Sequence, residues 1–540
     1  MSRFPRPDPD RAAAYRRSGA WGDDVIPDLI LANAARHPGK CAVRDASGET
    51  LSYGELASQS ARLAGALAAR GVGPGDVVTV CLPNWCRTVT VFLAVMRLGA
   101  VVNPVPVTYG RADLIHAIKT CDSRVLVLTD RFRSADYRSV LAAMPAELMA
   151  GRTVLMLGDE PSPDTLGWED ALSASEAATV ALRADDPVAV LFTSGTESRS
   201  KGAIHTHNTI LFGERAMATA LGAGEGDVAF MASPISHTTG FMHGVVMTLM
   251  TGGTLSLLDI FEGSVAARQM AAHGATWTMG ATPFLADISA AVTAERIELP
   301  AFRYFLCGGA PIPEVLARSA TDAGFRVLSI YGATESPPHT MVHPDDPVEN
   351  AWLTDGRPFP GIEVRIVGGD GQDCPLGETG EEWSRGPNTF LGYLGEPELT
   401  AKALDAEGWV HSGDLARLLT DGSLRITGRL KEIIVRGGQN ISVREVEDYL
   451  AAHPAIGRGV VVGIPHPRLG ETGCAVVVLQ QGTSLTLPDL TGYLIEKGIA
   501  KFKLPERLEI WSELPMNPSG KIQKFIIRQR LAEQDEKAGA

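Results

Sequence analysis

The sequence predicts an α/β protein in which a large N-terminal domain of parallel-sheet α/β layers, with a β-rich subdomain, precedes a small α+β C-terminal domain on a hinge. Its 540 residues are several times the length of a typical domain. Between residues 51 and 330, short apolar strands alternate with helical patterns, which is typical of parallel strands covered by helices. From about Gly371 onward, short strands separated by Gly/Asp turns replace that alternation.

The elements of the large domain follow from the spacing of apolar residues. Leu56, Leu63 and Leu67 recur at helical intervals, and residues 88–98 repeat the pattern. Short, mostly apolar runs predict buried strands at 77–82, 124–128, 188–192, 303–306 and 325–330. Residues 161–175 are rich in Pro, Asp, Gly and Ser, and they predict a surface connection.

The compact α+β pattern after Arg429 places the domain boundary there, so we assign residues 1–428 and 429–540 to the two domains. Pro488 suits the first turn of the last predicted helix, where a missing N–H does no harm. The predicted elements of the small domain are strands at 432–435, 459–462 and 475–479 and helices at 443–452 and 488–497.

Composition and charge narrow the class of protein. The chain carries 49 basic and 63 acidic residues, a net charge of −14, which argues against a nucleic-acid partner. Seven scattered cysteines include no Cys-x-x-Cys pair and indicate reduced thiols. The N-terminus lacks an apolar signal region, and the charge-free stretch 228–258 is interrupted by His, Thr and Gly, so we expect no membrane span and a cytoplasmic enzyme.

One loop, residues 193–202, has the composition of a phosphate-binding segment. It follows a predicted strand and combines hydroxyls, glycines, an arginine and Lys201. Hydroxyls and glycine N–H groups can surround a polyphosphate while cations balance its charge. A P-loop would place its lysine between Gly and Ser/Thr, and Lys201 instead precedes Gly202. The loop therefore predicts nucleotide binding of another kind.

Six further segments accompany that loop. In chain order they are 234–240 (PISHTTG), 307–313 (CGGAPIP), 331–336 (YGATES), 408–414 (GWVHSGD), 428–441 (GRLKEIIVRGGQNI) and 518–522 (PSGKI). In this order and spacing, the seven segments resemble the adenylate-forming superfamily of acyl-CoA synthetases, peptide-synthetase adenylation domains and luciferases. The resemblance covers nearly the whole chain and is closest to the acyl- or aryl-CoA ligases.

The resemblance implies an AMP-forming, ATP-dependent acyl-CoA ligase that uses ATP, Mg²⁺ and coenzyme A. A carboxylic acid and ATP would form an acyl-adenylate, and coenzyme A would then convert the adenylate to a thioester and AMP. The small domain would rotate about Lys431 between these half-reactions. Lys521 would catalyse adenylation, His237 would gate the acyl pocket, and Gly437 and Gly438 would line the pantetheine tunnel.

The resemblance also implies which residues bind each part of the nucleotide. Thr334 would contact the α-phosphate and Glu335 would bind Mg²⁺. Asp414, assisted by Arg429, would accept hydrogen bonds from the ribose hydroxyls. The β- and γ-phosphates are assigned to Thr193, Ser194, Gly195, Thr196 and Lys201, and the adenine to Gly309, Ala310, Pro311, Tyr331 and Gly332.

The predicted acyl pocket is apolar. Residues 228–258 contain no Asp or Glu to pair with a substrate ammonium, which disfavours a free amino acid. A medium-chain, alicyclic, aromatic or terpenoid acid fits, bound as the acid or as its acyl-adenylate. The residues assigned to this pocket are Phe241, Met279, Gly280, Ala281, Cys307, Gly308 and His339.

Three departures from the family's usual phosphate loop leave alternatives open. Glu197 replaces a hydroxyl, Ser198 a glycine and Ser200 a proline, and a carboxylate works against phosphate binding. One hypothesis is a protein with weak or lost adenylation that thioesterifies a supplied acyl-adenylate. A second is a ligase that loads a carrier protein's pantetheine instead of coenzyme A. A third is a non-catalytic nucleotide- or acyl-adenylate-binding protein, against which intact Lys521 counts.

Overall fold

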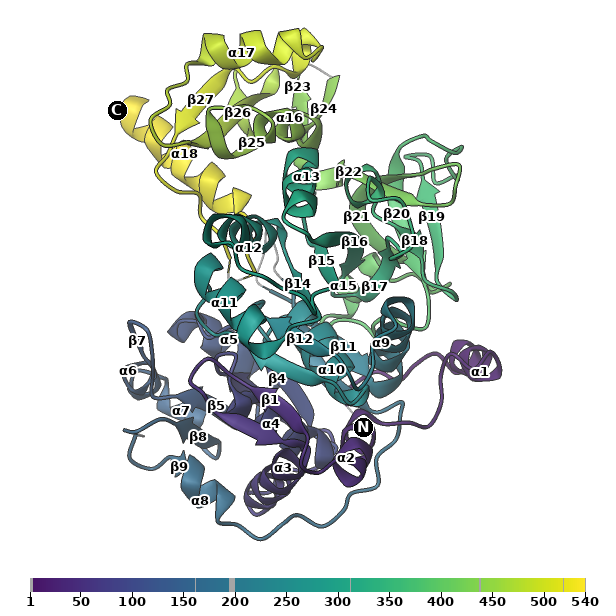
Figure 1. Cartoon of the computed structure of the whole chain (residues 1–540), viewed down its shortest axis with the longest axis vertical. Helices are drawn as coiled ribbons and strands as arrows, with labels where there is room; N and C mark the ends of the chain where they lie inside the picture. Colours follow the sequence, from purple (N-terminus) through teal and green to yellow (C-terminus); the bar gives the residue numbers. More distant parts are fainter. Residues whose placement is uncertain are drawn as a thin grey trace.

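The computed structural model describes residues 3–160, 162–193, 200–310, 312–436, 439–517 and 519–539. Two large sheets with their helices form the body of the molecule, a four-stranded sheet lies beside them, and a small domain stands at one end (Figure 1). The predicted fold class is therefore confirmed. Within the described ranges, no helix combines the length and the apolar character needed to cross a membrane.

The nine-stranded sheet carries most of the predicted site segments. Its inner strands run parallel, and its two ends are antiparallel. The order is β18 (Arg357–Pro358), β17 (Ser336–Met341), β16 (Arg326–Ala333), β15 (Tyr304–Gly308), β14 (Trp277–Gly280), β12 (Val228–Met231), β13 (Thr254–Leu257), β1 (Cys41–Arg44) and β2 (Thr50–Ser52).

The seven-stranded sheet ends in the hairpin that carries the predicted phosphate loop. This hairpin is its antiparallel edge, and the other strands are parallel. The order is β11 (Gly202–Thr206), β10 (Pro187–Phe192), β4 (Val101–Pro104), β3 (Val77–Cys81), β5 (Val125–Thr129), β8 (Thr153–Leu157) and β9 (Leu166–Gly167). A short ribbon of β6 (Arg131–Phe132) and β7 (Ala135–Asp136) follows β5.

Helices of the large domain cover both sheets. One of them, α4, is buried on nearly all its faces because it packs against strands of both sheets, which explains its apolar sequence from Val89 to Met96. The helices are α1 (Pro9–Arg17), α2 (Ile26–Arg36), α3 (Tyr53–Ala68), α4 (Cys86–Arg97), α5 (Arg111–Cys121), α6 (Tyr137–Ala142), α7 (Ala146–Met149), α8 (Trp168–Leu172), α9 (His207–Leu221), the π-helix η1 (Thr239–Val246), α10 (Met247–Met250), α11 (Gly263–His273), α12 (Thr282–Glu295), α13 (Glu314–Asp322) and α14 (Asn350–Leu353).

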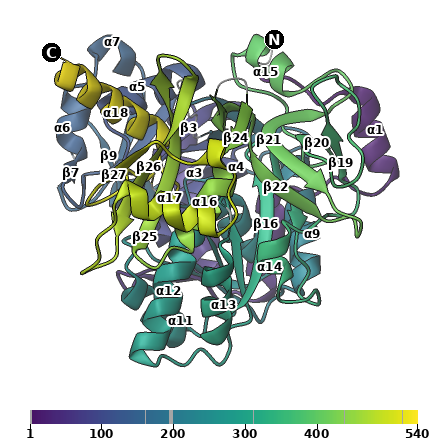
Figure 2. The same cartoon turned by 90° about the horizontal axis from the view of Figure 1, so that it is seen from above.

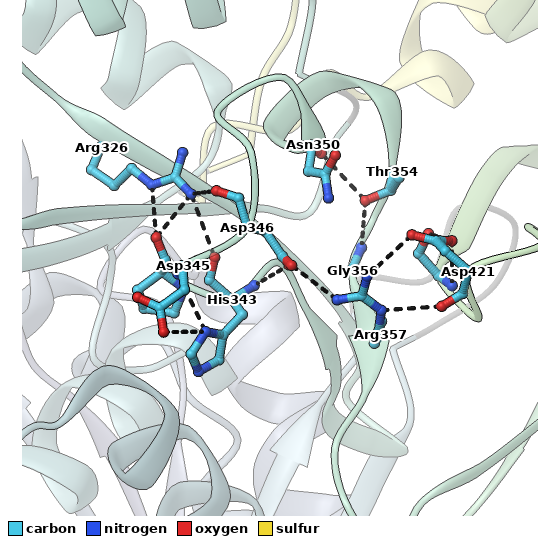
Figure 3. A network of polar contacts seen from close by, with 11 residues as sticks. Arg326, His343, Asp345, Asp346, Asn350, Thr354, Gly356, Arg357 and Asp421 are labelled. Atoms are coloured by element: carbon cyan, nitrogen blue, oxygen red, sulfur yellow. Dashed lines mark hydrogen bonds and ion pairs between the residues drawn. The ribbon is translucent and has the colours of Figure 1, made fainter.

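The antiparallel subdomain stands beside the nine-stranded sheet and is tied to it by charge. Arg357 pairs with Asp346 at 2.9 Å and with Asp421 at 3.2 Å, and Arg326 donates to the Pro344 carbonyl at 3.0 Å (Figure 3). The pair with Asp421 joins the turn between β21 and β22 to the nine-stranded sheet. Its elements are β19 (Glu363–Val367), β20 (Gly380–Arg385), α15 (Pro397–Ala403), β21 (Val410–Leu418) and β22 (Leu424–Arg429).

The small domain has its own core and stands next to the subdomain when viewed from above (Figure 2). Thr486 and Asp489 form the capping box that begins α17, with a proline in its first turn as predicted. The elements are η2 (Leu430–Glu432), β23 (Ile433–Arg436), β24 (Gln439–Ser442), α16 (Val443–Ala451), β25 (Ile456–His466), β26 (Gly470–Leu479), α17 (Leu487–Glu496), η3 (Lys501–Lys503), β27 (Arg507–Ile510) and α18 (Lys524–Gly539).

One predicted segment is corrected by the structure. Residues 162–175 are not only a surface connection, because they contain β9 and α8. Trp168 and Ala171 of α8 are buried against α3. Because polar and turn-forming residues surround Trp168 and Ala171, the composition of the segment did not indicate this short apolar contact.

Candidate active site

The ends of neighbouring parallel strands bring several predicted segments to one edge of the nine-stranded sheet. Met279 of β14 lies opposite Leu306 of β15, and Gly308 of β15 lies opposite Ile330 of β16. The loops that follow these strands therefore emerge side by side, as ligand-binding loops do in parallel sheets. The loop containing His237 follows β12 of the same sheet.

Lys521 reaches this edge from the small domain. Gly309 adopts φ +81°, and a Cβ built there would lie only 2.7 Å from Lys521 Cε and 3.3 Å from Nζ. The absence of a side chain at Gly309 thus leaves the space that the lysine occupies. Lys521 is held in a hairpin turn, in which its N–H donates to Asn517 Oδ1 at 2.8 Å.

The turn that carries Lys521 rests on the large domain. Gly520 has φ +81°, and a Cβ built there would lie 3.3 Å from the Phe284 ring at the start of α12. Burial lowers the pKa of Lys521 to about 8, helped by Arg429, while Asp414 and Glu335 act in the opposite direction. One cation, two carboxylates and the lysine therefore influence one another at this edge.

Thr334 and Glu335 form the turn between β16 and β17. The Thr334 carbonyl bonds to His205 Nε2 at 2.7 Å, and its hydroxyl lies 3.5 Å from the Thr238 hydroxyl. Glu335 Oε1 accepts a hydrogen bond from the Tyr393 hydroxyl. Lys201 Nζ lies 4.5 Å from the centre of the Tyr393 ring, so Tyr393 connects the lysine of the hairpin to Glu335.

The described part of the predicted phosphate loop is its base. The Thr193 N–H donates to the Lys201 carbonyl at 2.9 Å and closes the β10–β11 hairpin. The Ser200 carbonyl bonds to His116 Nε2 at 2.9 Å. Several predicted or substituted positions lie outside the described residues: Ser194, Gly195, Thr196, Glu197, Ser198, Pro311, Gly437 and Gly438.

The predicted ribose-binding pair forms within the four-stranded sheet. Asp414 of β21 and Arg429 of β22 are cross-strand partners, with Nε and Oδ1 2.9 Å apart. Asp414 Oδ2 accepts from the Tyr331 hydroxyl at 2.7 Å. Both carboxylate oxygens are therefore held in place, and each keeps a lone pair for a further donor.

His237 is half-buried and lies just before the π-helix η1. Its Nδ1 accepts from the Thr239 N–H at 3.3 Å, which orients the ring. Burial lowers the pKa of His237 to about 3, and the nearby Lys521 and His243 add to this effect. The imidazole is therefore neutral. π-helical turns are rare and occur often at functional sites.

The residues assigned to the acyl pocket divide into two groups. Met279, Gly280 and Ala281 lie next to Cys307 and Gly308 at the ends of β14 and β15. Phe241 and His339 have other neighbours. Phe241 packs edge-to-face against Phe92 with ring centres 5.2 Å apart, and His339 packs against Tyr331 at 4.6 Å.

Two residues of the site were not predicted from the sequence. Tyr393, which contacts Glu335, follows a glycine in an unremarkable loop, and no local pattern marks it. The sequence gives one weak indication of Glu382, because this charged residue occupies an inward-facing position of β20 where alternation favours an apolar residue.

No group of three or more His, Cys, Asp and Glu side chains that could hold a metal occurs within the described ranges. His205 bonds to the Thr334 carbonyl, and His207 Nδ1 accepts from the Ile26 N–H at 3.2 Å. These two histidines therefore have structural partners.

Comparisons with known proteins show the family of this chain. The family description "AMP-binding enzyme" matches residues 30–394, and "AMP-binding enzyme C-terminal domain" matches residues 445–521. The medium-chain fatty-acid–CoA ligase of Escherichia coli K12 is 40% identical over 527 residues, which cover 96% of this chain and 93% of that protein. The feruloyl-CoA synthase of an Amycolatopsis species is 33% identical, covering 92% and 97%.

The structural comparison points the same way. The crystal structure of ATP-bound MatB from Rhodopseudomonas palustris superposes with a TM-score of 0.83 at 30% identity, covering 93% of this chain and 98% of MatB. Two family descriptions thus match in order over most of the chain, and the solved structure spans both domains. This chain belongs to the AMP-binding enzymes, the adenylate-forming superfamily that includes the acyl-CoA ligases.

Proposed function

We propose that this enzyme activates an apolar carboxylic acid with ATP as its acyl-adenylate and then transfers the acyl group to coenzyme A. The observation that carries the proposal is the position of Lys521, a small-domain residue that lies against Gly309 of the large domain. An ammonium there can balance the charge of a carboxylate and of an α-phosphate together, which is what adenylation requires.

The first half-reaction uses the groups that surround Lys521. Lys521 Nζ would contact the carboxylate oxygen and the α-phosphate, and the Thr334 hydroxyl would donate to the same phosphate. Asp414 would accept from the ribose hydroxyls, and the Tyr331 ring would lie against the adenine. The neutral His237 would close the acyl pocket on the side of the pantetheine tunnel.

The residues present suit a magnesium ion on the phosphates. Glu335 is a hard oxygen donor, and Tyr393 holds its Oε1, which leaves Oε2 for a metal. When bound, Mg²⁺ would neutralise phosphate charge and so favour attack by the carboxylate.

The second half-reaction requires the small domain to move, and we propose 429–540 as the moving unit with its hinge at Lys431. Lys524 of α18 bonds to Glu432 at 2.6 Å and to Glu447 of α16 at 3.0 Å. This bridge joins the residue after Lys431 to the body of the small domain. Rotation at the hinge would therefore carry Lys521 away and bring residues 437–438 to the acyl group.

We propose a medium-length apolar acid as the substrate class. The strand ends that would line it present Met279, Ala281 and the buried Cys307, and the relative with 40% identity is named for medium-chain fatty acids. Because ATP and coenzyme A are its co-substrates, we propose that the enzyme acts in the cytoplasm.

The test measures thioester formation from coenzyme A over a panel of apolar acids in two reactions. One reaction supplies acid, ATP and Mg²⁺, and the other supplies presynthesised acyl-adenylate. Product from both would support a complete ligase. Product from the adenylate alone would mean that Glu197, Ser198 and Ser200 mark a lost first step. No product from either reaction would contradict the proposal.

A third reaction replaces coenzyme A with a pantetheine-bearing carrier protein. We expect coenzyme A to be the better acceptor. A clear preference for the carrier would reassign the enzyme to carrier loading. Binding of nucleotide or acyl-adenylate without turnover in any of the three reactions would indicate a non-catalytic protein.

A further inference from the structure

A buried histidine–carboxylate pair lies behind the residues assigned to adenine and ribose. His339 of β17 and Glu382 of β20 have side chains 1% and 0% exposed, and Nε2 and Oε1 are 3.4 Å apart. His339 Nδ1 bonds to the Ser336 carbonyl at 2.9 Å, which fixes its ring. Nε2 and Oε1 face each other without a hydrogen bond, and burying such groups costs desolvation free energy, so the presence of this pair calls for a physical account.

The pair touches Tyr331 on two sides. The His339 ring packs against the Tyr331 ring with centres 4.6 Å apart and planes at 87°. Glu382 Oε2 lies 3.4 Å from the Tyr331 hydroxyl, and that hydroxyl lies 2.7 Å from Asp414 Oδ2. One hydroxyl proton therefore faces two carboxylates, and it can donate fully to only one of them.

The charge of His339 decides which carboxylate receives the proton. Burial disfavours the imidazolium, but Glu382, the bond to the Ser336 carbonyl and Asp414 together raise the pKa of His339. When His339 is charged, it neutralises Glu382, which favours the shorter bond from the Tyr331 hydroxyl to Asp414. Without His339, Glu382 would be a buried carboxylate with no counter-ion and would compete for that hydroxyl.

We propose that His339 and Glu382 are a positioning pair for ATP, which sets the direction of the Tyr331 hydroxyl and thereby the orientation of Asp414 toward the ribose. The proposal rests on the proposed function. It moves His339 from the acyl pocket, where the sequence placed it, to the nucleotide side of the site. Neither residue of the pair touches ATP, and both act through Tyr331 and Asp414.

The experiment combines His339→Leu with nucleotides that lack one ribose hydroxyl. Adenylate formation is measured with ATP, 2′-deoxyATP and 3′-deoxyATP. We expect His339→Leu to raise the KM for ATP about tenfold, as loss of one well-oriented charged contact does. The penalty that wild type shows for the deoxynucleotides should shrink in the variant, because both changes act through Asp414. The KM values for the acid and for coenzyme A should not change.

Two further variants keep the test decisive if His339→Leu folds poorly. Glu382→Gln keeps the shape of the side chain and should raise the KM for ATP only about threefold, because a neutral amide competes weakly for the hydroxyl. The double variant His339→Leu/Glu382→Leu removes both charges and should recover most of the affinity lost in His339→Leu.

The chain offers a matched control in a second buried pair, His243 and Glu214, which lie 2.9 Å apart. His243→Leu should lower the unfolding temperature as His339→Leu does, but it should leave the KM for ATP and the deoxynucleotide penalty unchanged. If His339→Leu instead shifts the acid preference and leaves both nucleotide readouts unchanged, the proposal is wrong and His339 lines the acyl pocket.

A calorimetric measurement separates this proposal from the proposed function. AMP binding is measured without turnover in wild type and in His339→Leu. If no enzyme form makes adenylate but His339→Leu still weakens AMP binding, the positioning pair stands and the ligase assignment fails. If adenylate forms and AMP binds both proteins equally, the ligase stands and the positioning pair fails.

Discussion

At the scale of single residues, the half-buried ammonium of Lys521 links the two domains chemically. Its pKa of about 8 lies well below the usual value for a lysine, mainly because of burial. Adenylation needs the charged form, since only the ammonium can stabilise the negative charge that develops between carboxylate and phosphate. The reaction should therefore be sensitive to pH near neutrality.

We expect the rate of adenylate formation to fall as pH rises through about 8, because the folded enzyme loses the Lys521 proton there. Lys521→Ala should lower that rate by about 10²–10³-fold and abolish this pH dependence. Measuring single-turnover pyrophosphate release against pH, in wild type and in Lys521→Ala, tests both expectations. Thioester formation from supplied acyl-adenylate is the control and should survive the substitution; its equal loss would mean that Lys521 does not act in adenylation.

Tyr393 should affect Mg²⁺ binding because its hydroxyl orients Glu335. We expect Tyr393→Phe to raise the Mg²⁺ concentration needed for half-maximal adenylation by about tenfold, because a carboxylate without its hydrogen-bond partner is poorly oriented. The matched control is Tyr53→Phe, which removes a buried hydroxyl that donates to the Gly253 carbonyl at 2.7 Å, away from the site. An unchanged Mg²⁺ requirement in Tyr393→Phe would contradict this role.

At the scale of elements, the turn after β15 has a backbone conformation that makes room for another domain. Gly309 has φ +81°, and the space above its Cα is filled by Lys521. The glycine therefore does two things, since it permits the left-handed turn and removes the side chain that would block the lysine.

We expect Gly309→Ala to impair adenylation nearly as much as Lys521→Ala, because the methyl group would stand 2.7 Å from Lys521 Cε. Gly324→Ala is the control that separates the effect of backbone strain from the effect of blocking Lys521. Gly324 also has positive φ, +90°, but nothing lies within 4 Å of a Cβ there. Both variants should lose about 1 kcal/mol of stability, and only Gly309→Ala should lose adenylation. Equal effects on adenylation would show that strain alone is responsible.

At the scale of the whole molecule, one exposed ion pair helps to hold the small domain in its present orientation. Arg458 of β25 faces Asp287 of α12 across the domain boundary at 3.7 Å, and both side chains are more than a third exposed. Such a pair contributes about 0–1 kcal/mol. A weak contact suits a domain that must leave this orientation in every catalytic cycle.

We expect Arg458→Gln to slow adenylation by up to about fivefold, since loss of the pair removes up to about 1 kcal/mol from the orientation that places Lys521. Thioester formation from supplied acyl-adenylate should not slow. Added salt should reproduce the effect in wild type and have less effect in the variant. A slower second half-reaction would contradict this interpretation.

The local pattern of the chain determined the elements and the order of the site segments. Apolar spacing predicted α3, β3, α4, β5, β15 and β16, and residues such as Asp414 and Glu335 could be assigned because each belongs to a short contiguous motif. The periodicities of strands and helices depend on residues that are close in sequence, so these elements can be predicted without knowledge of the tertiary structure.

Only the tertiary structure decided which polar side chains became partners. Tyr393 meets Glu335 from 58 residues away, and Glu382 of the four-stranded subdomain reaches Tyr331 and His339 of the nine-stranded sheet. Residues 162–175 likewise contain a helix that is buried only through its contact with α3, so the local sequence did not predict it. These contacts arise where separate sheets pack together, and no local period encodes them, because the free energy of such a pair depends on burial that the whole fold creates.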